Sequence, residues 1–118
     1  MPAPIRLGTQ GWNYDAWVGP FYPEGTRAID FLSVYSRAFD TVEVDSTFYA
    51  VPTATTVQSW VERTDEGFVF CPKVPREITH DRRLRGAAAA LEACLDRMRQ
   101  LGDRLGPIQI QLGPDFSP

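Results

Sequence analysis

The chain has few of the residues that mark several common protein classes. Its two cysteines, Cys71 and Cys94, lie far apart and fit no metal-ligand or redox spacing, so reduced thiols in a cytoplasmic protein are the simplest interpretation. The N-terminus lacks the basic start and apolar run of a secretory signal. No window is long and apolar enough to cross a membrane. We therefore expect a cytoplasmic protein with no membrane partner.

Charge and ligand motifs are equally sparse. The twelve basic and fifteen acidic residues are well mixed and give a net charge of −3, which disfavours a whole-surface attraction to nucleic acid. The segment Gly8–Gly11 has neither the spacing nor the following helix start of a glycine-rich dinucleotide site. One histidine and two candidate carboxylates are too few to predict a metal site, and no cofactor is indicated.

Four short runs alternate apolar and polar residues in one shared phase: residues 5–8, 41–45, 68–73 and 108–112. Successive side chains of a strand point to opposite faces, so each run predicts a strand with one apolar and one polar face. The apolar face would collect Ile5, Leu7, Val42, Val44, Phe68, Phe70, Ile108 and Ile110. The polar face would collect Arg6, Gly8, Glu43, Asp45, Cys71, Lys73, Gln109 and Gln111. Polar groups on a shielded face are costly unless they are paired or used, so this face predicts a functional site.

Helical patterns separate the four runs. We expect helices over 28–39, over 53–64 with Thr53 as the cap, and over 87–101 with a stripe that includes Leu84 and either Cys94 or Leu95. This alternation predicts an α/β protein with a parallel sheet. A small open doubly wound sheet and part of a (β/α) barrel both have this order. The single apolar face favours the barrel, and four strands with three helices would form about half of one, as a single domain over 1–118.

Several blocks of the chain resemble the YecE-like family, also called domain of unknown function 72. They are GTQGWNYDAWVGPFYPEG, FDTVEVDSTFYAVPTATTVQSW, DEGFVFCPKVPREITH and LGPIQIQLGPDF, which together cover essentially the whole chain. The resemblance implies a TIM-barrel fold of roughly twice this length, and hence the N-terminal half of a barrel here. It implies a set of motif positions rather than an activity. The last block normally reads Gln-Leu-Pro-Pro, whereas this chain has Gln111-Leu112-Gly113-Pro114.

The strongest catalytic candidates lie at the carboxyl ends of the strands, where barrels of this class place their active sites. Glu43 and Asp45 are two residues apart on one strand, and Lys73 ends the next strand with the same facing. We assign a carboxylate as general acid or base and Lys73 as a charge-stabilising group, or as a Schiff-base nucleophile if burial lowers its pKa. The alternative is a Glu43–Lys73 or Glu43–Arg6 ion pair that only neutralises charge, with Asp45 capping the following turn.

Other candidates follow the strand ends. His80 is either a proton carrier or a loop histidine bonded to backbone. The aromatic candidates either stack on a sugar or base, or pack the loops onto the barrel rim. The predicted substrate-binding residues are Trp12, Tyr14, Trp17, Thr47, Phe48, Tyr49, Arg76, Thr79 and Gln111. A basic run either grips a phosphate-bearing ligand or nucleic acid, or forms a solvated face: Lys73, Arg76, Arg82, Arg83 and Arg85.

These residues predict an enzyme of the hydrolase or lyase type that acts on a small polar or phosphorylated substrate. One alternative is a non-catalytic module that binds nucleic acid or a partner protein. Another is an inactive truncated fragment. A lone four-stranded array would leave its edges unpaired, which predicts self-association through those open edges.

Overall fold

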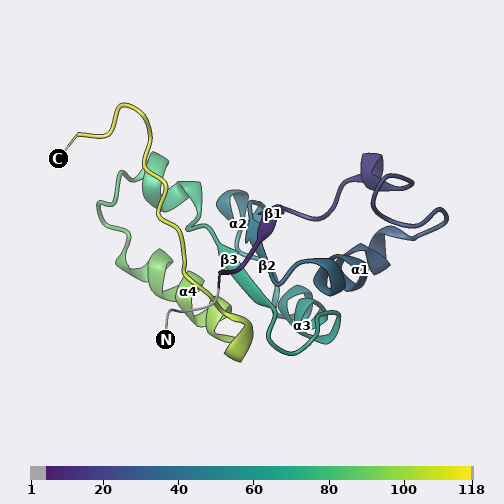
Figure 1. Cartoon of the computed structure of the whole chain (residues 1–118). Coiled ribbons are helices and arrows are strands. Elements are labelled where there is room, and N and C mark those ends of the chain that lie inside the picture. The colour runs from purple at the N-terminus through teal and green to yellow at the C-terminus, as the bar shows by residue number, and fades with distance from the viewer. Residues whose placement is uncertain (1–4, 118) are drawn as a thin grey trace.

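Three parallel strands form the centre of the protein in a computed structural model that describes residues 5–117 (Figure 1). They are β1 (Gly8–Gln10), β2 (Thr41–Val44) and β3 (Val69–Pro72), in the order β1-β2-β3. Thr9 pairs with Val42, and Val42 pairs with Phe70. The predicted strands at 41–45 and 68–73 are confirmed to within one residue at each end, as is their parallel pairing.

The first predicted strand is displaced toward the C-terminus. Residues 5–7 lie outside β1, because Arg6 donates a side-chain hydrogen bond to the Gly67 carbonyl at 2.6 Å and the Leu7 N–H donates to Asp40 Oδ1 at 2.9 Å. The predicted burial of Ile5 and Leu7 is wrong, since these side chains are 94% and 70% exposed. These contacts fix the chain at the amino-terminal end of the sheet, before the ladder begins.

Gly8 allows β1 to approach β2 closely. A Cβ atom at this position would lie 1.9 Å from the Thr41 carbonyl oxygen, so no other residue fits without moving the backbone. A glycine inside a strand often marks such a close approach. Pairing of β1 with β2 therefore depends on this residue.

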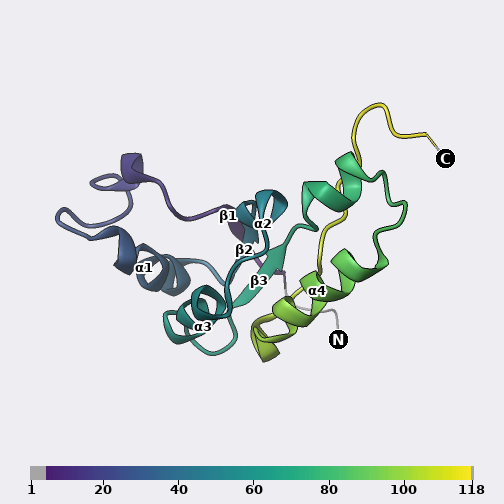
Figure 2. The ribbon, with the colours of Figure 1, turned by 180° about the vertical axis from the view of Figure 1, so that it is seen from behind.

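The apolar face of the sheet carries the core. Its helices are α1 (Phe31–Ala38), α3 (Ala54–Glu62) and α4 (Ala88–Arg99). Both views show α1 and α3 side by side and α4 along the flank of β3 (Figures 1 and 2). Each large apolar side chain buried here contributes roughly 1.5–3 kcal/mol. The core cluster consists of Tyr22, Phe31, Leu32, Tyr35, Val42, Val44, Val57, Trp60, Phe68, Phe70, Cys94, Met98 and Leu101.

The helix boundaries follow local signals. α3 begins after Thr53, whose side chain accepts a hydrogen bond from the Thr56 N–H at 3.1 Å, which confirms the predicted cap. Of the two alternatives predicted for the buried stripe of α4, Cys94 is buried and Leu95 is not. Leu84 is 45% exposed and lies outside α4, so its predicted place in the helical stripe is wrong. Its φ of 68° is incompatible with a right-handed helix.

Short helical segments complete the described part of the chain. They are the 3-10 turns η1 (Asp15–Trp17), η2 (Ala28–Asp30) and η4 (Gly102–Arg104), the short helix α2 (Ser46–Tyr49) and a π-helical turn, η3 (Glu77–Asp81). None of the helices in residues 5–117 is both long and apolar enough to span a membrane.

The fourth predicted strand, 108–112, is wrong as a continuous strand. The segment runs parallel to β3 through two isolated bridges only, Phe70 with Leu105 and Lys73 with Gln109. The N–H groups of Gly106 and Gln109 donate to the carbonyls of Phe70 and Pro72, so three residues of this segment span two of β3 and the ladder is interrupted. Ile110 is 60% exposed, so its predicted position beneath the helices is also wrong.

The molecule is more open than a compact domain of its size. Its radius of gyration is 15.5 Å, whereas a compact domain of this length has roughly 13.5 Å. The core cluster fills the side of the sheet that carries Val42 and Phe70. The opposite side carries Glu43, Cys71 and Lys73, none of which is fully buried. The predicted separation of apolar and polar faces is thus confirmed for β2 and β3.

Candidate functional site

Lys73 lies between two carboxylates at the carboxyl ends of β2 and β3. Its Nζ is 3.1 Å from Glu43 Oε1 and 2.9 Å from Asp45 Oδ1. The Lys73 side chain is only 11% exposed, against 33% for Glu43 and 27% for Asp45. The predicted convergence of these three residues is therefore present. Arg6 does not pair with Glu43, because its guanidinium binds carbonyl oxygens at the other end of the sheet.

The two carboxylates keep the lysine charged. Contact with Asp45 is the main cause that raises the pKa of Lys73 above its ordinary value of 10.5; burial opposes this rise, and Glu43 adds to it. A Schiff-base nucleophile needs an unprotonated amine near neutral pH. The raised pKa therefore argues against that role and favours the charge-stabilising one.

Asp45 is the least satisfied member of this group. Its Oδ1 atom is buried and, although it lies 2.9 Å from the Lys73 ammonium, no well-directed hydrogen bond reaches it from the described residues. The contact is best regarded as an ion pair, since opposite charges at this distance attract whatever their hydrogen-bond angle. Asp45 precedes α2 but makes no side-chain cap there, so the predicted capping role is not what holds it.

Thr47 positions the lysine from within the protein. Its hydroxyl donates to the Val44 carbonyl at 3.0 Å and accepts from the Lys73 N–H at 2.8 Å. These bonds join β2 to β3 just beyond the last ladder pair, Val44 with Pro72. The side chain is 0% exposed, so the prediction that Thr47 contacts substrate directly is wrong. It acts instead on the backbone that carries Lys73.

His80 lies on the same rim, separated from Lys73 by Phe48. The His80 ring meets the Phe48 ring edge-on at 5.1 Å between centroids, and Lys73 Nζ lies 5.9 Å from the Phe48 centroid. Thr79 is 1% exposed, and its hydroxyl is 2.8 Å from His80 Nδ1. The histidine is therefore held by a side chain rather than by backbone. Thr79 supports the ring and, like Thr47, is too buried to contact a ligand.

The aromatic candidates divide between packing and exposure. Trp12 packs edge-on against Trp60 at 5.5 Å, and Trp17 lies 4.7 Å from Tyr14. These contacts agree with the interpretation that the loop packs onto the rim. Tyr14 is 39% exposed and Tyr49 is 71% exposed, so both remain accessible.

Two predicted polar contacts lie away from the charged centre. Arg76 is exposed and pairs with Asp81 at 3.9 Å. Gln111 is exposed and follows the bridge between Lys73 and Gln109. Among the described residues, no hydrogen bond or ion pair joins Arg76 or Gln111 to the two carboxylates.

The basic run is largely neutralised by nearby acids. Arg82 pairs with Glu77 at 3.1 Å, and Arg83 lies 3.4 Å from Asp115. All four of these side chains are at least 44% exposed, so solvent screens them. This arrangement matches a solvated face better than a phosphate or nucleic-acid grip.

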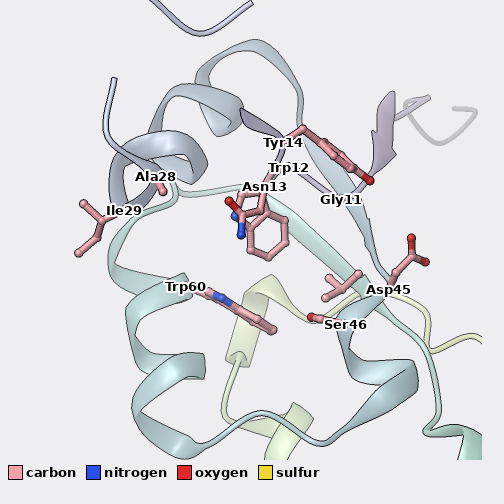
Figure 3. Close-up of a pocket in the computed structure, with 10 residues that line it drawn as sticks. Gly11, Trp12, Asn13, Tyr14, Ala28, Ile29, Asp45, Ser46 and Trp60 are labelled. Atoms are coloured by element: carbon pink, nitrogen blue, oxygen red, sulfur yellow. The ribbon is translucent and has the colours of Figure 1, made fainter. Parts of the chain in front are cut away.

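A pocket of about 520 Å³ opens beside Asp45, at the ends of β1 and β2 (Figure 3). Trp12 and Trp60 are in contact and form its apolar wall, with Asn13 and Tyr14 next to Trp12. Ala28 and Ile29 lie on one side of these rings and Asp45 and Ser46 on the other, with the Asp45 carboxylate directed outward. The complete lining is Gly11, Trp12, Asn13, Tyr14, Ala28, Ile29, Val44, Asp45, Ser46 and Trp60. Asp45 thus belongs to both the charged centre and the pocket.

Sequence reasoning missed several of these residues. Trp60 was expected only in the buried face of its helix. Ser46 lies in a block that resembles the family but was given no role, and Ile29 carries no motif. One available signal was composition, because Lys73 is the only lysine beside eleven arginines. Arginine and lysine are not interchangeable, so a single lysine between two carboxylates marks a special position.

The donor set for a metal ion is small. Among residues 5–117, no group of three or more histidine, cysteine or acidic side chains is arranged to hold one. Lys73 already occupies the space between the two carboxylates of the charged centre.

Comparisons with known proteins place this chain in a family. Residues 6–118 match the family model described as "Protein of unknown function DUF72". The chain is 34% identical to the UPF0759 protein YecE of Escherichia coli K12, over 97% of this chain and 39% of YecE. It is 35% identical to the UPF0759 protein YunF of Bacillus subtilis, over 67% of this chain and 27% of YunF. The chain thus spans about two fifths or less of these relatives.

Solved structures of the same family agree with this assignment. The crystal structure of a DUF72 family protein from Thermotoga maritima superposes with a TM-score of 0.80 at 26% identity, over 96% of this chain and 46% of that one. A DUF72 structure from Enterococcus faecalis gives a TM-score of 0.75 at 22% identity, which supports the fold alone. The family predicted from the four sequence blocks is confirmed: the chain belongs to the DUF72 family.

Proposed function

We propose that the chain is the N-terminal half of a TIM-barrel enzyme of the hydrolase or lyase type, with its active site at the carboxyl ends of the strands. The observation that carries this proposal is the placement of the only lysine, Lys73, between Glu43 and Asp45. Active sites of (β/α) barrels lie at this end of the strands. Support for a barrel comes from parallel strands with one helix-covered face, and from relatives more than twice as long.

The chemistry follows from the charges. A carboxylate in this position can remove or donate a proton, while an ammonium that is charged near neutral pH stabilises negative charge that develops on the substrate. Lys73 fits the second role because its pKa is raised. Glu43 fits the first better than Asp45, because its side chain is the more exposed of the two carboxylates.

The charge balance also narrows the substrate. Two carboxylates and one ammonium leave the centre with a net negative charge, which repels an anionic group. A small polar substrate without a phosphate therefore fits better than a phosphorylated one.

The proposal is tested by turnover in the protein that carries this chain. Mixtures of small polar metabolites would be incubated with the parent, and loss of individual compounds followed by mass spectrometry. We expect Glu43→Gln and Lys73→Ala to lower turnover by about 100-fold or more, since general acid–base catalysis is typically worth that much. The matched control is Glu66→Gln, because Glu66 lies exposed in the turn before β3.

Folding must be measured beside activity. The melting temperature of Glu43→Gln should stay within a few degrees of the parent value. If both variants keep full turnover, or if they lose it only in proportion to unfolding, then the charged centre is structural and the proposed function is wrong.

A further inference from the structure

We infer that the pocket beside Asp45 binds a neutral saccharide, with the C–H groups of a sugar ring against the accessible apolar side chains of the lining and the hydroxyl groups toward its polar groups. This inference deepens the proposed function and rests on it in one respect, because Asp45 joins the pocket to the charged centre.

The apolar wall of the pocket is held rigidly. Trp12 and Trp60 meet edge-to-face at 5.5 Å, and Trp60 stacks on Phe70 at 5.6 Å. The buried Tyr22 hydroxyl donates a 2.5 Å hydrogen bond to the Trp12 carbonyl, which fixes the loop. Ile29 extends the apolar surface on the other side and is 55% exposed. A concave apolar surface of this kind gains free energy when it covers C–H groups of a ligand.

The polar wall offers complementary hydrogen-bonding groups. Figure 3 shows the Asn13 amide on the side of Ala28, the Ser46 hydroxyl directed toward Trp60, and the Asp45 carboxylate at the edge of the pocket, directed away from the tryptophans. An ionised carboxylate only accepts hydrogen bonds, whereas an amide and a hydroxyl both donate and accept. A ligand with several hydroxyl groups can satisfy all three. It donates to Asp45 and exchanges hydrogen bonds with Asn13 and Ser46.

Two other ligand classes fit less well. A phosphate would face Asp45, and neither an arginine nor a lysine is among the residues that line the pocket. A nucleobase needs a free aromatic face for stacking. Trp60 does not offer such a face, because it is only 9% exposed and its ring is already stacked on Phe70. A sugar ring needs only apolar contact to its C–H groups, which the half-buried Trp12 and the exposed Ile29 can supply.

The size of the pocket suits a sugar. Its volume of about 520 Å³ lies within the range of roughly 300–1,000 Å³ that is typical of small-molecule sites. It therefore has room for one or two rings rather than for a long polymer.

The three tryptophans of the chain allow a direct test. Indole N–H signals of the ¹⁵N-labelled full chain would be recorded by NMR during titration with glucose, galactose, mannose and cellobiose, and assigned with single Trp→Phe variants. We expect at least one of these sugars to move the Trp12 and Trp60 signals in a saturable way. Trp17 does not line the pocket, so its signal should move least. Glucose 6-phosphate should bind at least tenfold more weakly than glucose, and adenosine should cause no shift.

Variants distinguish a loss of sugar binding at the pocket from a general loss of folding. Asn13 is exposed, so Asn13→Ala should leave the fold intact and weaken sugar binding about five- to tenfold, the loss expected for one hydrogen bond. Asp45→Asn should also weaken binding, whereas its matched control Asp65→Asn, in the exposed turn before β3, should not.

The outcomes distinguish this inference from the proposed function. Saccharide binding that survives Glu43→Gln, without turnover of any sugar, would uphold the ligand class and count against the enzyme. Glu43-dependent turnover of another small polar compound, with no shift caused by any of the four sugars, would uphold the enzyme and overturn the ligand class. Tighter binding of adenosine or glucose 6-phosphate than of every neutral sugar would also overturn it.

Discussion

The backbone N–H of Lys73 donates a 2.8 Å hydrogen bond to the buried hydroxyl of Thr47. The same hydroxyl donates to the Val44 carbonyl at the end of the neighbouring strand. One side chain thereby fixes the distance between the strand end that carries Glu43 and the strand end that carries Lys73. The geometry of the charged centre depends on this link.

Thr47→Val should therefore destabilise the protein despite its similar shape. The change leaves the Lys73 N–H and the Val44 carbonyl without their partner, and a buried unsatisfied group costs about 1–3 kcal/mol. We expect the free energy of unfolding in urea to fall by about 2 kcal/mol or more. Thr55→Val, at an exposed position of α3, should change it by less than about 0.5 kcal/mol. Equal effects of the two variants would show that the link is unimportant.

Gly8→Ala should break the pairing of β1 with β2. The added methyl group would lie 1.9 Å from the Thr41 carbonyl oxygen, which is backbone and cannot rotate away. Gly67→Ala is the control, because nothing lies within 4 Å of its Cβ position and only its φ of 92° opposes the change, at a cost of about 1 kcal/mol. We expect hydrogen exchange at β1 and β2 to accelerate strongly in Gly8→Ala alone. Unchanged protection of the Gly11 N–H, which donates to the Glu43 carbonyl, would contradict this expectation.

Self-association through the open edges remains a prediction for the chain by itself. β1 is an edge strand and is preceded by the exposed Leu7, while the segment beside β3 ends with the exposed Ile110. Unpaired edges flanked by apolar side chains favour pairing with another chain. Light scattering after size-exclusion chromatography should show oligomers that grow with concentration. Leu7→Lys and Ile110→Lys should reduce them, whereas Ile29→Lys, at a residue that is 55% exposed and belongs to no strand, should not. A monomeric parent at every concentration would refute this expectation.

The sequence was most informative where one local rule decides the structure. Alternation located β2 and β3, because each has one face against the core and one polar face. The same phase predicted that Glu43 and Lys73 share one face, and the two side chains form an ion pair. Thr53 was recognisable as a helix cap because its hydroxyl serves the first turn of its own helix.

The sequence was least informative where contacts between residues far apart in the chain decide the structure. Alternation placed Leu7 beneath the helices, but Asp40 binds its N–H before the ladder starts. Isoleucine alternation predicted a fourth strand, yet the segment has one extra residue between its hydrogen bonds to Phe70 and Pro72 and forms only isolated bridges. The pocket could not be predicted from the sequence for the same reason. Trp60 reads as a core residue of its helix, and only the folded loop brings Asn13 opposite it.

The unfolding free energy at high pH gives a further test of the charged centre. Lys73 has a raised pKa in the folded state, so its stabilising contribution is fully present below its ordinary pKa of 10.5 and is lost as pH rises through the folded-state value. Burial also raises the pKa of Tyr22 to about 12, so the parent must be compared with Lys73→Met rather than judged alone. The difference in unfolding free energy between the two proteins should narrow above pH 10.5. A difference that is constant from pH 8 to 12 would contradict this.

The most direct measurement is an NMR titration of the Lys73 side chain. Because Lys73 is the only lysine, ¹³C-lysine labelling gives a single side-chain spin system. We expect its pKa to lie above 10.5, and to fall in Asp45→Asn and by a smaller amount in Glu43→Gln, while Glu66→Gln leaves it unchanged. A pKa of 10.5 that is the same in all four proteins would show that the two carboxylates do not hold this lysine, and the proposed active site would be lost with it.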